Sequence, residues 1–274
     1  MADQQEISFQ GKKIRYTVVG QGSPVVLVHG FCEDSDVWKY QREPLSRHHR
    51  LIIPDLPGAG ASELTDTFSM ELAADCLLQI LQHENIAHTI LIGHSMGGYI
   101  TLAFAEKYPD RLRAFGLFHS TAYADNDEKK TTRQRSIEFI RTHGSYEYLK
   151  QSIPNLFSPE SRISMGGAIS GMIEQHKHFN PYTLIACQQA MMQRPDRTRV
   201  LRTFKKPVLF IMGKHDTAVP YEQSLQQSHL PRISYIHILE HAGHMGMWEE
   251  KEKANPALLS FLSGASVIDT ESHA

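Results

Sequence analysis

Short apolar runs alternate with helical patterns along the first 120 residues of the chain. The run at residues 25–28 is rich in β-branched residues, which is typical of a strand buried on both faces of a parallel sheet. The pattern predicts strands at residues 14–19, 25–28, 51–53, 89–92 and 114–118. Ser69 is a suitable N-cap for a helix with Leu72, Cys76, Leu77 and Ile80 on one face. A second helix is predicted at residues 98–108 and ends at Pro109.

The pattern changes between residues 121 and 199, where it predicts amphipathic helices and no buried strand. Prolines at four positions predict the helix boundaries in this stretch. They are Pro154, Pro159, Pro181 and Pro195. Strand patterns return at residues 208–212 and 234–239, and a last amphipathic helix is predicted at residues 255–262.

Alternating strands and helices indicate an α/β fold, with a mostly parallel central sheet and helices on both faces. A length of 274 residues suits one such domain that carries an insertion. We assign residues 1–120 and 200–274 to the core domain. Residues 121–199 are assigned to a helical cap above one end of the sheet.

The segment Gly93-His94-Ser95-Met96-Gly97 lies between a predicted strand and a predicted helix. This is the context of the G-x-S-x-G nucleophile elbow, a strained turn that lifts a serine hydroxyl clear of a sheet. Bulky neighbours would clash in such a turn, which explains the flanking glycines. We therefore predict that Ser95 is a nucleophile.

A serine hydroxyl becomes a good nucleophile only with a general base and an acid that orients the base. In this architecture the partners follow along the chain in the order Ser, Asp, His. Asp216 follows the strand at 208–212, and His244 follows the strand at 234–239. Since the carboxyl ends of parallel strands share one edge, both should lie near Ser95.

His241 is the alternative base, but Gly243 gives the loop freedom to turn His244 inward. His237, His241 and His244 could also be considered as metal ligands. They span a strand and a loop instead of one helix face, so we predict neither a metal nor a cofactor.

Two backbone N–H groups should stabilise the oxyanion, one from Met96 and one from Phe31 in the loop after the strand at 25–28. His119, Met191 and Trp248 are candidates for the substrate pocket, with ordinary packing as the alternative. His119 ends a predicted strand, Met191 lies in the cap, and Trp248 closely follows the predicted base.

Composition limits the kinds of partner that the protein can bind. The formal net charge is −2, so no basic face for nucleic acid is expected. Cys32, Cys76 and Cys187 form no C-x-x-C pair, which indicates reduced thiols. The polar, acidic first ten residues do not resemble a signal peptide, and no apolar stretch approaches membrane-spanning length. A cytoplasmic protein without membrane contact is expected, and its oligomeric state stays open.

These segments resemble the α/β-hydrolase superfamily over nearly the whole chain outside the cap. The resemblance rests on His29-Gly30-Phe31 with Trp38, the DLPGAGAS turn at 55–62, the elbow, the loop at 213–220 and Gly243-His244. It implies the fold and the Ser-Asp-His set named above, and a cap over the site.

Within the superfamily, Ser95 argues against haloalkane dehalogenases and epoxide hydrolases, which use an aspartate there. The elbow most resembles that of small carboxylesterases. We predict a serine hydrolase that cleaves a carboxylic ester of a small, apolar to moderately polar molecule, with water, through an acyl-enzyme. The alternatives are a carbon–carbon bond hydrolase, a lactonase or a thioesterase on the same residues, and a ligand receptor without turnover.

Overall fold

One eight-stranded sheet organises the computed structural model, which describes residues 3–271. Its strand order is β1-β2-β4-β3-β5-β6-β7-β8. Strand β2 is antiparallel to both β1 and β4, and the other neighbours are parallel, which confirms a mostly parallel sheet. The strands are β1 Asp3–Phe9, β2 Lys12–Val19, β3 Ser23–Val28, β4 His49–Pro54, β5 Thr89–His94, β6 Leu112–Phe118, β7 Val208–Gly213 and β8 Ser234–Leu239.

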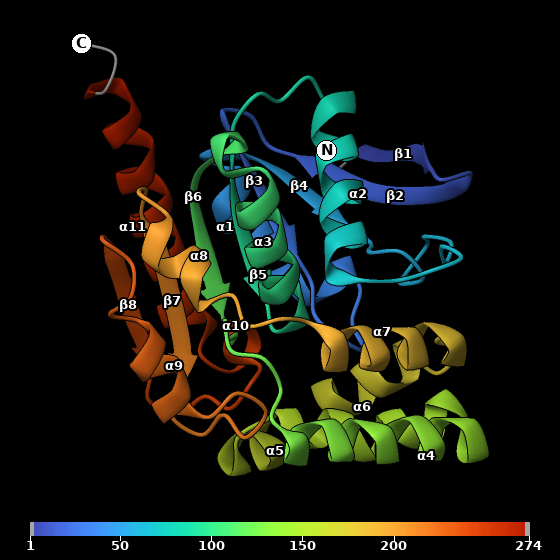
Figure 1. Ribbon diagram of the computed structural model, residues 1–274. Helices are drawn as coiled ribbons and strands as arrows, with labels where there is room; N and C mark the ends of the chain where they lie inside the picture. The colour runs from blue at the N-terminus through green and yellow to red at the C-terminus, as the bar shows by residue number, and fades with distance from the viewer. Residues whose placement is uncertain (1–2, 272–274) are drawn as a thin grey trace.

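Helices cover both faces of this sheet (Figure 1). Along β3, Val26 and Val28 belong to one apolar cluster, and Val25 and Leu27 belong to another, as expected when side chains alternate between faces. The first cluster includes residues of α2 and α3, and the second includes residues of α1 and α11. The helices of the two faces and their edges are α1 Lys39–Ser46, α2 Met70–His83, α3 Met96–Lys107, α8 Thr198–Thr203, α9 Tyr221–Gln227, α10 Gly246–Glu249 and α11 Lys251–Glu271.

Four helices between β6 and β7 form a separate layer at one end of the sheet (Figure 1). They are α4 Asp127–Ser152, α5 Pro159–Ser164, α6 Gly166–Gln175 and α7 Pro181–Gln193. Pro159 and Pro181 occupy the first turns of α5 and α7, where a missing N–H costs nothing. This layer, together with its connections, is called the helical insertion below and covers residues 121–199.

Two elements differ from the sequence-based expectation. Residues 3–9 form the edge strand β1, of which only Ile7 and Phe9 are buried, so its apolar signal is weak. The last helix was expected at 255–262, but α11 is longer and contains Pro256 near its start. Among the residues described, no helix is both long enough and apolar enough to cross a membrane.

Candidate active site

Ser95 sits in the turn between β5 and α3, with φ 51° and ψ −116°. A positive φ is uncommon for a residue that has a Cβ, so this turn stores backbone strain. The turn also needs its glycines. A Cβ on Gly97 would stand 2.4 Å from the carbonyl oxygen of Val28, and one on Gly93 would stand 2.3 Å from the oxygen of Gly97. The local sequence therefore holds the hydroxyl at the carboxyl end of β5.

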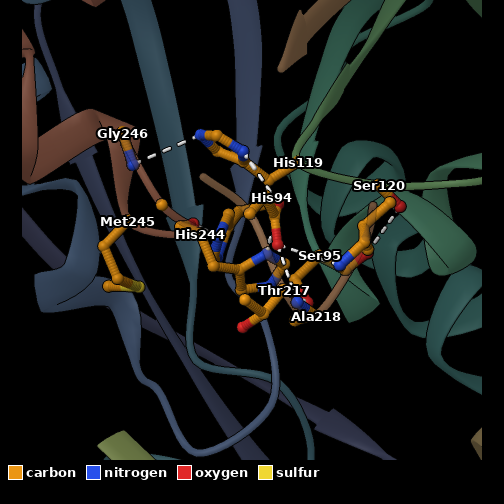
Figure 2. Close-up of polar contacts among 12 residues, drawn as sticks. His94, Ser95, His119, Ser120, Thr217, Ala218, His244, Met245 and Gly246 are labelled. Carbon is orange, nitrogen blue, oxygen red and sulfur yellow. Dashed lines mark hydrogen bonds and ion pairs between the residues drawn. The ribbon is translucent and has the colours of Figure 1, made fainter. Parts of the chain in front are cut away.

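A continuous hydrogen-bonded relay joins three side chains at this edge. His244 Nε2 lies 2.8 Å from Ser95 Oγ, and His244 Nδ1 lies 2.8 Å from Asp216 Oδ2. Figure 2 shows His244 beside Ser95, with His94 and His119 next to it. The alternative base, His241, has an exposed side chain near Glu160 and takes no part in this relay. The three residues predicted from the sequence are therefore brought together.

Four donors surround the carboxylate of Asp216. Its Oδ1 accepts from the N–H groups of Ala218 and Val219, both at 2.9 Å, and its Oδ2 accepts from His244 and His119. Burial alone would raise the pKa of Asp216. The positive charge available on His244 and the hydrogen bonds from both histidines outweigh burial and hold that pKa well below its usual range. Asp216 therefore stays ionised and orients His244.

His119 has a different role from the one its sequence position suggested. Its Nδ1 lies 3.1 Å from Asp216 Oδ2, and the N–H of Gly246 donates to its Nε2 at 3.2 Å (Figure 2). A backbone N–H can only donate, so Nε2 carries no proton and Nδ1 carries one. Burial, the largest effect, lowers the pKa of His119, which agrees with this neutral form. His119 thus lies behind Asp216 and not in the substrate cavity.

The same protonation pattern bears on metal binding. The ligand atoms of His119, Asp216 and His244 lie within 4.8 Å of one another, a spacing that could hold an ion. Yet Nδ1 of His119 is committed to Asp216 as a donor, and its Nε2 lone pair is used by Gly246. The three residues therefore fit a hydrogen-bonded relay better than a metal site.

A second carboxylate–imidazole pair, which the sequence analysis missed, lies against the relay. Glu33 Oε2 lies 2.9 Å from His94 Nδ1 and accepts from the N–H of Gly30 at 2.6 Å. His94 Nε2 lies 2.9 Å from the carbonyl oxygen of His244. Both partners of the His94 ring are acceptors, so the ring is an imidazolium and Glu33 its counter-ion. We call Glu33 and His94 the buried brace, because it joins three loops of the site.

The electrostatics of the buried brace agree with its hydrogen bonds. Burial by itself opposes both charges. The mutual attraction of the two groups nevertheless lowers the pKa of Glu33 and raises that of His94. No sequence motif signalled Glu33, although His94 lies inside the elbow motif itself.

The two predicted oxyanion donors have no hydrogen-bond acceptor among the described residues. Phe31 lines the same cavity as Ser95, and its N–H has no hydrogen-bond acceptor in the described part of the chain. Met96 begins α3, where the first N–H groups have no acceptor within the helix. The Gly30 N–H is occupied by Glu33, so it is not available as a donor, and Phe31 stays the predicted donor from this loop.

A cavity of about 440 Å³ separates Ser95 from the helical insertion. That volume falls in the range of small-molecule sites. One wall, which we call the polar wall, comes from the insertion and includes Lys129, Thr132, Arg133, Tyr148 and Gln188. The apolar side includes Phe31, Leu156, Met191 and Val219.

Of the three pocket residues predicted from the sequence, Met191 lines this cavity, and His119 and Trp248 do not. Trp248 is buried in α10, its Nε1 donates to the carbonyl of Val37 at 2.8 Å, and its ring packs edge-on against Tyr40. The short helix α10 turns this side chain into the core, although the residue is close to His244 in sequence.

A serine that is activated through histidine by a buried aspartate, at the carboxyl edge of a mostly parallel sheet, defines a class of α/β hydrolytic proteins. A family model described as the alpha/beta hydrolase fold matches residues 23–118. A thermophilic esterase from Thermogutta terrifontis, solved with malate bound, is 30% identical. The match covers 96% of this chain and 99% of that one, with a TM-score of 0.90.

Two further relatives span almost the whole chain. The 2-hydroxy-6-oxononadienedioate/2-hydroxy-6-oxononatrienedioate hydrolase of Burkholderia vietnamiensis is 26% identical over 263 residues, which are 91% of each protein. The enol-lactonase from Burkholderia xenovorans has the same fold, with 22% identity, a TM-score of 0.88, and coverage of 94% of this chain and all of that one. The chain belongs to the α/β-hydrolase family, and it is a hydrolase.

Proposed function

We propose that the protein hydrolyses carboxylic esters through an acyl-enzyme on Ser95, with His244 as general base and Asp216 as the orienting acid. The observation that carries the proposal is the relay of two 2.8 Å contacts from Ser95 Oγ through His244 to Asp216. Such contacts are within reach for proton transfer from a nucleophilic hydroxyl. The similar esterase from Thermogutta terrifontis supports the same chemistry.

The reaction proceeds in two acyl-transfer steps. Ser95 Oγ attacks the ester carbonyl while His244 takes its proton, and the N–H groups of Phe31 and Met96 stabilise the oxyanion. Collapse of the tetrahedral intermediate expels the alcohol, which receives the proton from His244. Water then attacks the acyl-enzyme, with His244 again as base, and the acid leaves. The ionised Asp216 stabilises the imidazolium that forms in each step.

Cavity size and lining support a small, moderately polar substrate. A volume of about 440 Å³ suits a molecule of drug-like size or smaller. The apolar side would accept a short hydrocarbon chain or ring. The polar wall disfavours a long lipid chain, since hydrocarbon cannot replace the water that solvates the remaining hydrogen-bond donors of its charged side chains.

A second candidate within the same class is cleavage of a carbon–carbon bond or a lactone on the same residues. The relatives from Burkholderia vietnamiensis and Burkholderia xenovorans have these activities by name. A panel of p-nitrophenyl esters, lactones, acyl thioesters and dienoates, compared by kcat/KM, separates these reactions. The highest kcat/KM on a dienoate would favour the carbon–carbon hydrolase.

Labelling by a fluorophosphonate tests the nucleophile. We expect stoichiometric labelling of the wild type and none of Ser95→Ala. Ser136→Ala is the matched control, because Ser136 also lines the cavity but its hydroxyl donates to the helix carbonyl of Thr132. A folded wild type that is not labelled would contradict the proposal.

Turnover separates an enzyme from a receptor on the same fold. We expect steady release of both products from p-nitrophenyl acetate, at a rate that depends on Ser95. A single burst of p-nitrophenol followed by a stable acyl-protein would instead favour the receptor without turnover.

A further inference from the structure

A lysine without an acidic partner lies in the wall of the cavity that Ser95 opens into. Lys129 is half-buried in the first turn of α4 and lines this cavity. Its Nζ donates to the carbonyl oxygen of Ala218 at 2.9 Å. Among the described residues, no carboxylate lies within ion-pairing distance of this nitrogen. A charged ammonium that faces a ligand cavity with only a neutral partner retains donors for an anion.

Neighbouring guanidinium groups add to the positive charge of this wall. Arg133 donates to Asp125 at 2.5 Å and to Gln188 at 3.1 Å. Arg194 lies 2.9 Å from the other oxygen of Asp125. A single carboxylate thus faces two guanidinium groups, and positive charge is left over.

The remaining acidic groups at the cavity do not cancel this excess. Glu33 is already paired with His94 in the buried brace. Glu128 lines the cavity but is exposed, so water screens its charge. Positive charge therefore exceeds negative charge around the polar wall.

Tyr99 supplies a second observation at the same place. This residue of α3 lines the cavity, is only 3% exposed, and carries Arg194 at 3.8 Å from its ring centre. Its hydroxyl forms no hydrogen bond to any described residue and is not fully enclosed by protein, so it can donate to a ligand in the cavity. Burial raises the pKa of Tyr99, but the charges of Arg194, Lys129 and Arg133 outweigh burial and lower it.

We propose that the substrate carries a carboxylate in addition to the bond that Ser95 attacks, and that Lys129 binds this carboxylate, with the Tyr99 hydroxyl as a second donor. The inference rests on the proposed esterase function and adds a substrate class to it. A carboxylate can join Ala218 as a partner of Lys129, because an ammonium has three donors. The apolar side of the cavity then holds the carbon skeleton between the two reactive ends.

Two pairs of esters test this proposal, and the members of each pair differ only in a carboxylate or an uncharged carboxamide. The first pair is the mono-p-nitrophenyl ester of adipic acid and the p-nitrophenyl ester of adipamic acid, with the charge on the acyl side. The second pair is 4-acetoxybenzoate and 4-acetoxybenzamide, with the charge on the leaving group. We expect the wild type to prefer the carboxylate in at least one pair, after subtraction of spontaneous hydrolysis.

The variants assign the preference to Lys129. We expect Lys129→Met to lower kcat/KM for the preferred carboxylate about 10- to 100-fold, the effect of one charge-assisted hydrogen bond. Hydrolysis of the matching carboxamide should fall less, because a neutral oxygen attracts the ammonium more weakly, and Lys129→Arg should restore part of the preference. Lys130→Met is the matched control, because Lys130 is the exposed neighbour on α4 and does not line the cavity.

The structural alternative is that Lys129 only ties α4 to the loop after Asp216 through Ala218. In that case Lys129→Met would lower kcat/KM for both members of a pair equally, which would overturn the proposal. A wild type without preference in either pair would overturn it as well.

Calorimetric binding of the same four compounds to Ser95→Ala tests the carboxylate site without turnover. A carboxylate preference there that Lys129→Met abolishes supports the site even if the esterase proposal fails, and equal binding overturns it.

Discussion

Two buried carboxylate–imidazole pairs lie side by side at the carboxyl edge of the sheet. The rings of His94 and His244 are 5.0 Å apart, and each ring contacts a carboxylate through Nδ1. The pairs differ at Nε2, which meets the hydroxyl of Ser95 in His244 and a backbone carbonyl in His94. A hydroxyl can give up a proton and a carbonyl cannot, so only His244 can act as a base.

The same comparison explains why the His94 ring is already charged, whereas the His244 ring becomes charged only when it takes a proton from Ser95. His94 must keep both protons, because both of its ring nitrogens face acceptors. His244 leaves Nε2 available for the proton of Ser95. Both pairs thus contain a histidine and a carboxylate, and the partner of one imidazole nitrogen decides the role of the ring.

Removing the base should give the largest effect. We expect His244→Gln to lower kcat about 10⁴- to 10⁶-fold, as loss of a triad member does in serine hydrolases. The midpoint of thermal unfolding should stay within a few degrees of the wild type, because a polar side chain still fills the site. Ester kinetics with calorimetry check both values. If the variant retained most of the activity, a residue other than His244 would be the general base.

Removing the counter-ion of the buried brace should act on stability first. Glu33→Gln leaves the His94 imidazolium without its partner, and breaking a buried ion pair in this way costs about 3–5 kcal/mol. For a protein of this size we expect the thermal midpoint to fall by about 2–4 °C per kcal/mol. Urea unfolding measures the free energy. An unchanged stability with a large loss of kcat would instead place Glu33 in the relay.

The buried brace also predicts how stability depends on pH. The lowered pKa of Glu33 gives a contribution that is present above its unfolded value of about 4.3 and lost as the pH falls through the folded value. The raised pKa of His94 gives one that is present below about 6.5 and lost as the pH rises through the folded value.

We therefore expect the buried brace to stabilise the wild type most between about pH 4.3 and 6.5. Urea unfolding across about pH 2–9 measures this. In Glu33→Gln both slopes should become shallower. Part of the acid slope should remain, because Asp216 also has a lowered pKa. Slopes identical to those of the wild type would show that the buried brace does not titrate.

His119 should have a smaller effect, on the relay alone. His119→Phe keeps a ring of similar shape and removes one of the donors to Asp216. A hydrogen bond to a charged group contributes about 1.5–3 kcal/mol, so we expect kcat to fall at most about 10- to 100-fold. Loss of the donor also raises the pKa of Asp216. The loss of stability at acid pH should therefore be shallower than in the wild type, whereas a purely structural residue would leave that slope in place.

Ser69→Ala has the smallest expected effect and is a control that changes stability but leaves catalysis unchanged. The hydroxyl of Ser69 caps α2 by accepting from the N–H of Leu72 at 3.0 Å, outside the site. Ser69→Ala should cost about 1 kcal/mol, with unchanged kcat/KM. A change in kcat/KM here would mean that losses of stability reach the site, and the interpretation of Glu33→Gln would need correction.

Much of the fold was predictable from local pattern. The buried strands have near-continuous apolar runs, and the predicted strand positions agree with β2 to β8 within a few residues. The edge strand β1 was missed because its residues are mostly exposed and alternate weakly. Ser69 and the prolines of α5 and α7 act through their own backbone, so their effect can be read from sequence.

The site was predictable in part. Ser95, Asp216 and His244 each follow a strand, and parallel strands bring such positions to one edge. His119 was expected in the pocket from the same reasoning, but its ring turns behind Asp216. Trp248 was expected beside the pocket and packs in the core instead. Position along a strand predicts where a backbone ends, and it does not predict which way a side chain points.

Strands, helix caps, the strained turn at Ser95 and the order of the three polar residues follow from interactions between near neighbours in the chain. The roles of His94, His119 and His244 depend on partners 61, 97, 149 and 150 residues away. The protonation state of an imidazole depends on the donors, acceptors and burial around it. Those surroundings exist only after folding, so the tertiary structure alone separates the base from the buried brace and leaves Lys129 facing the cavity.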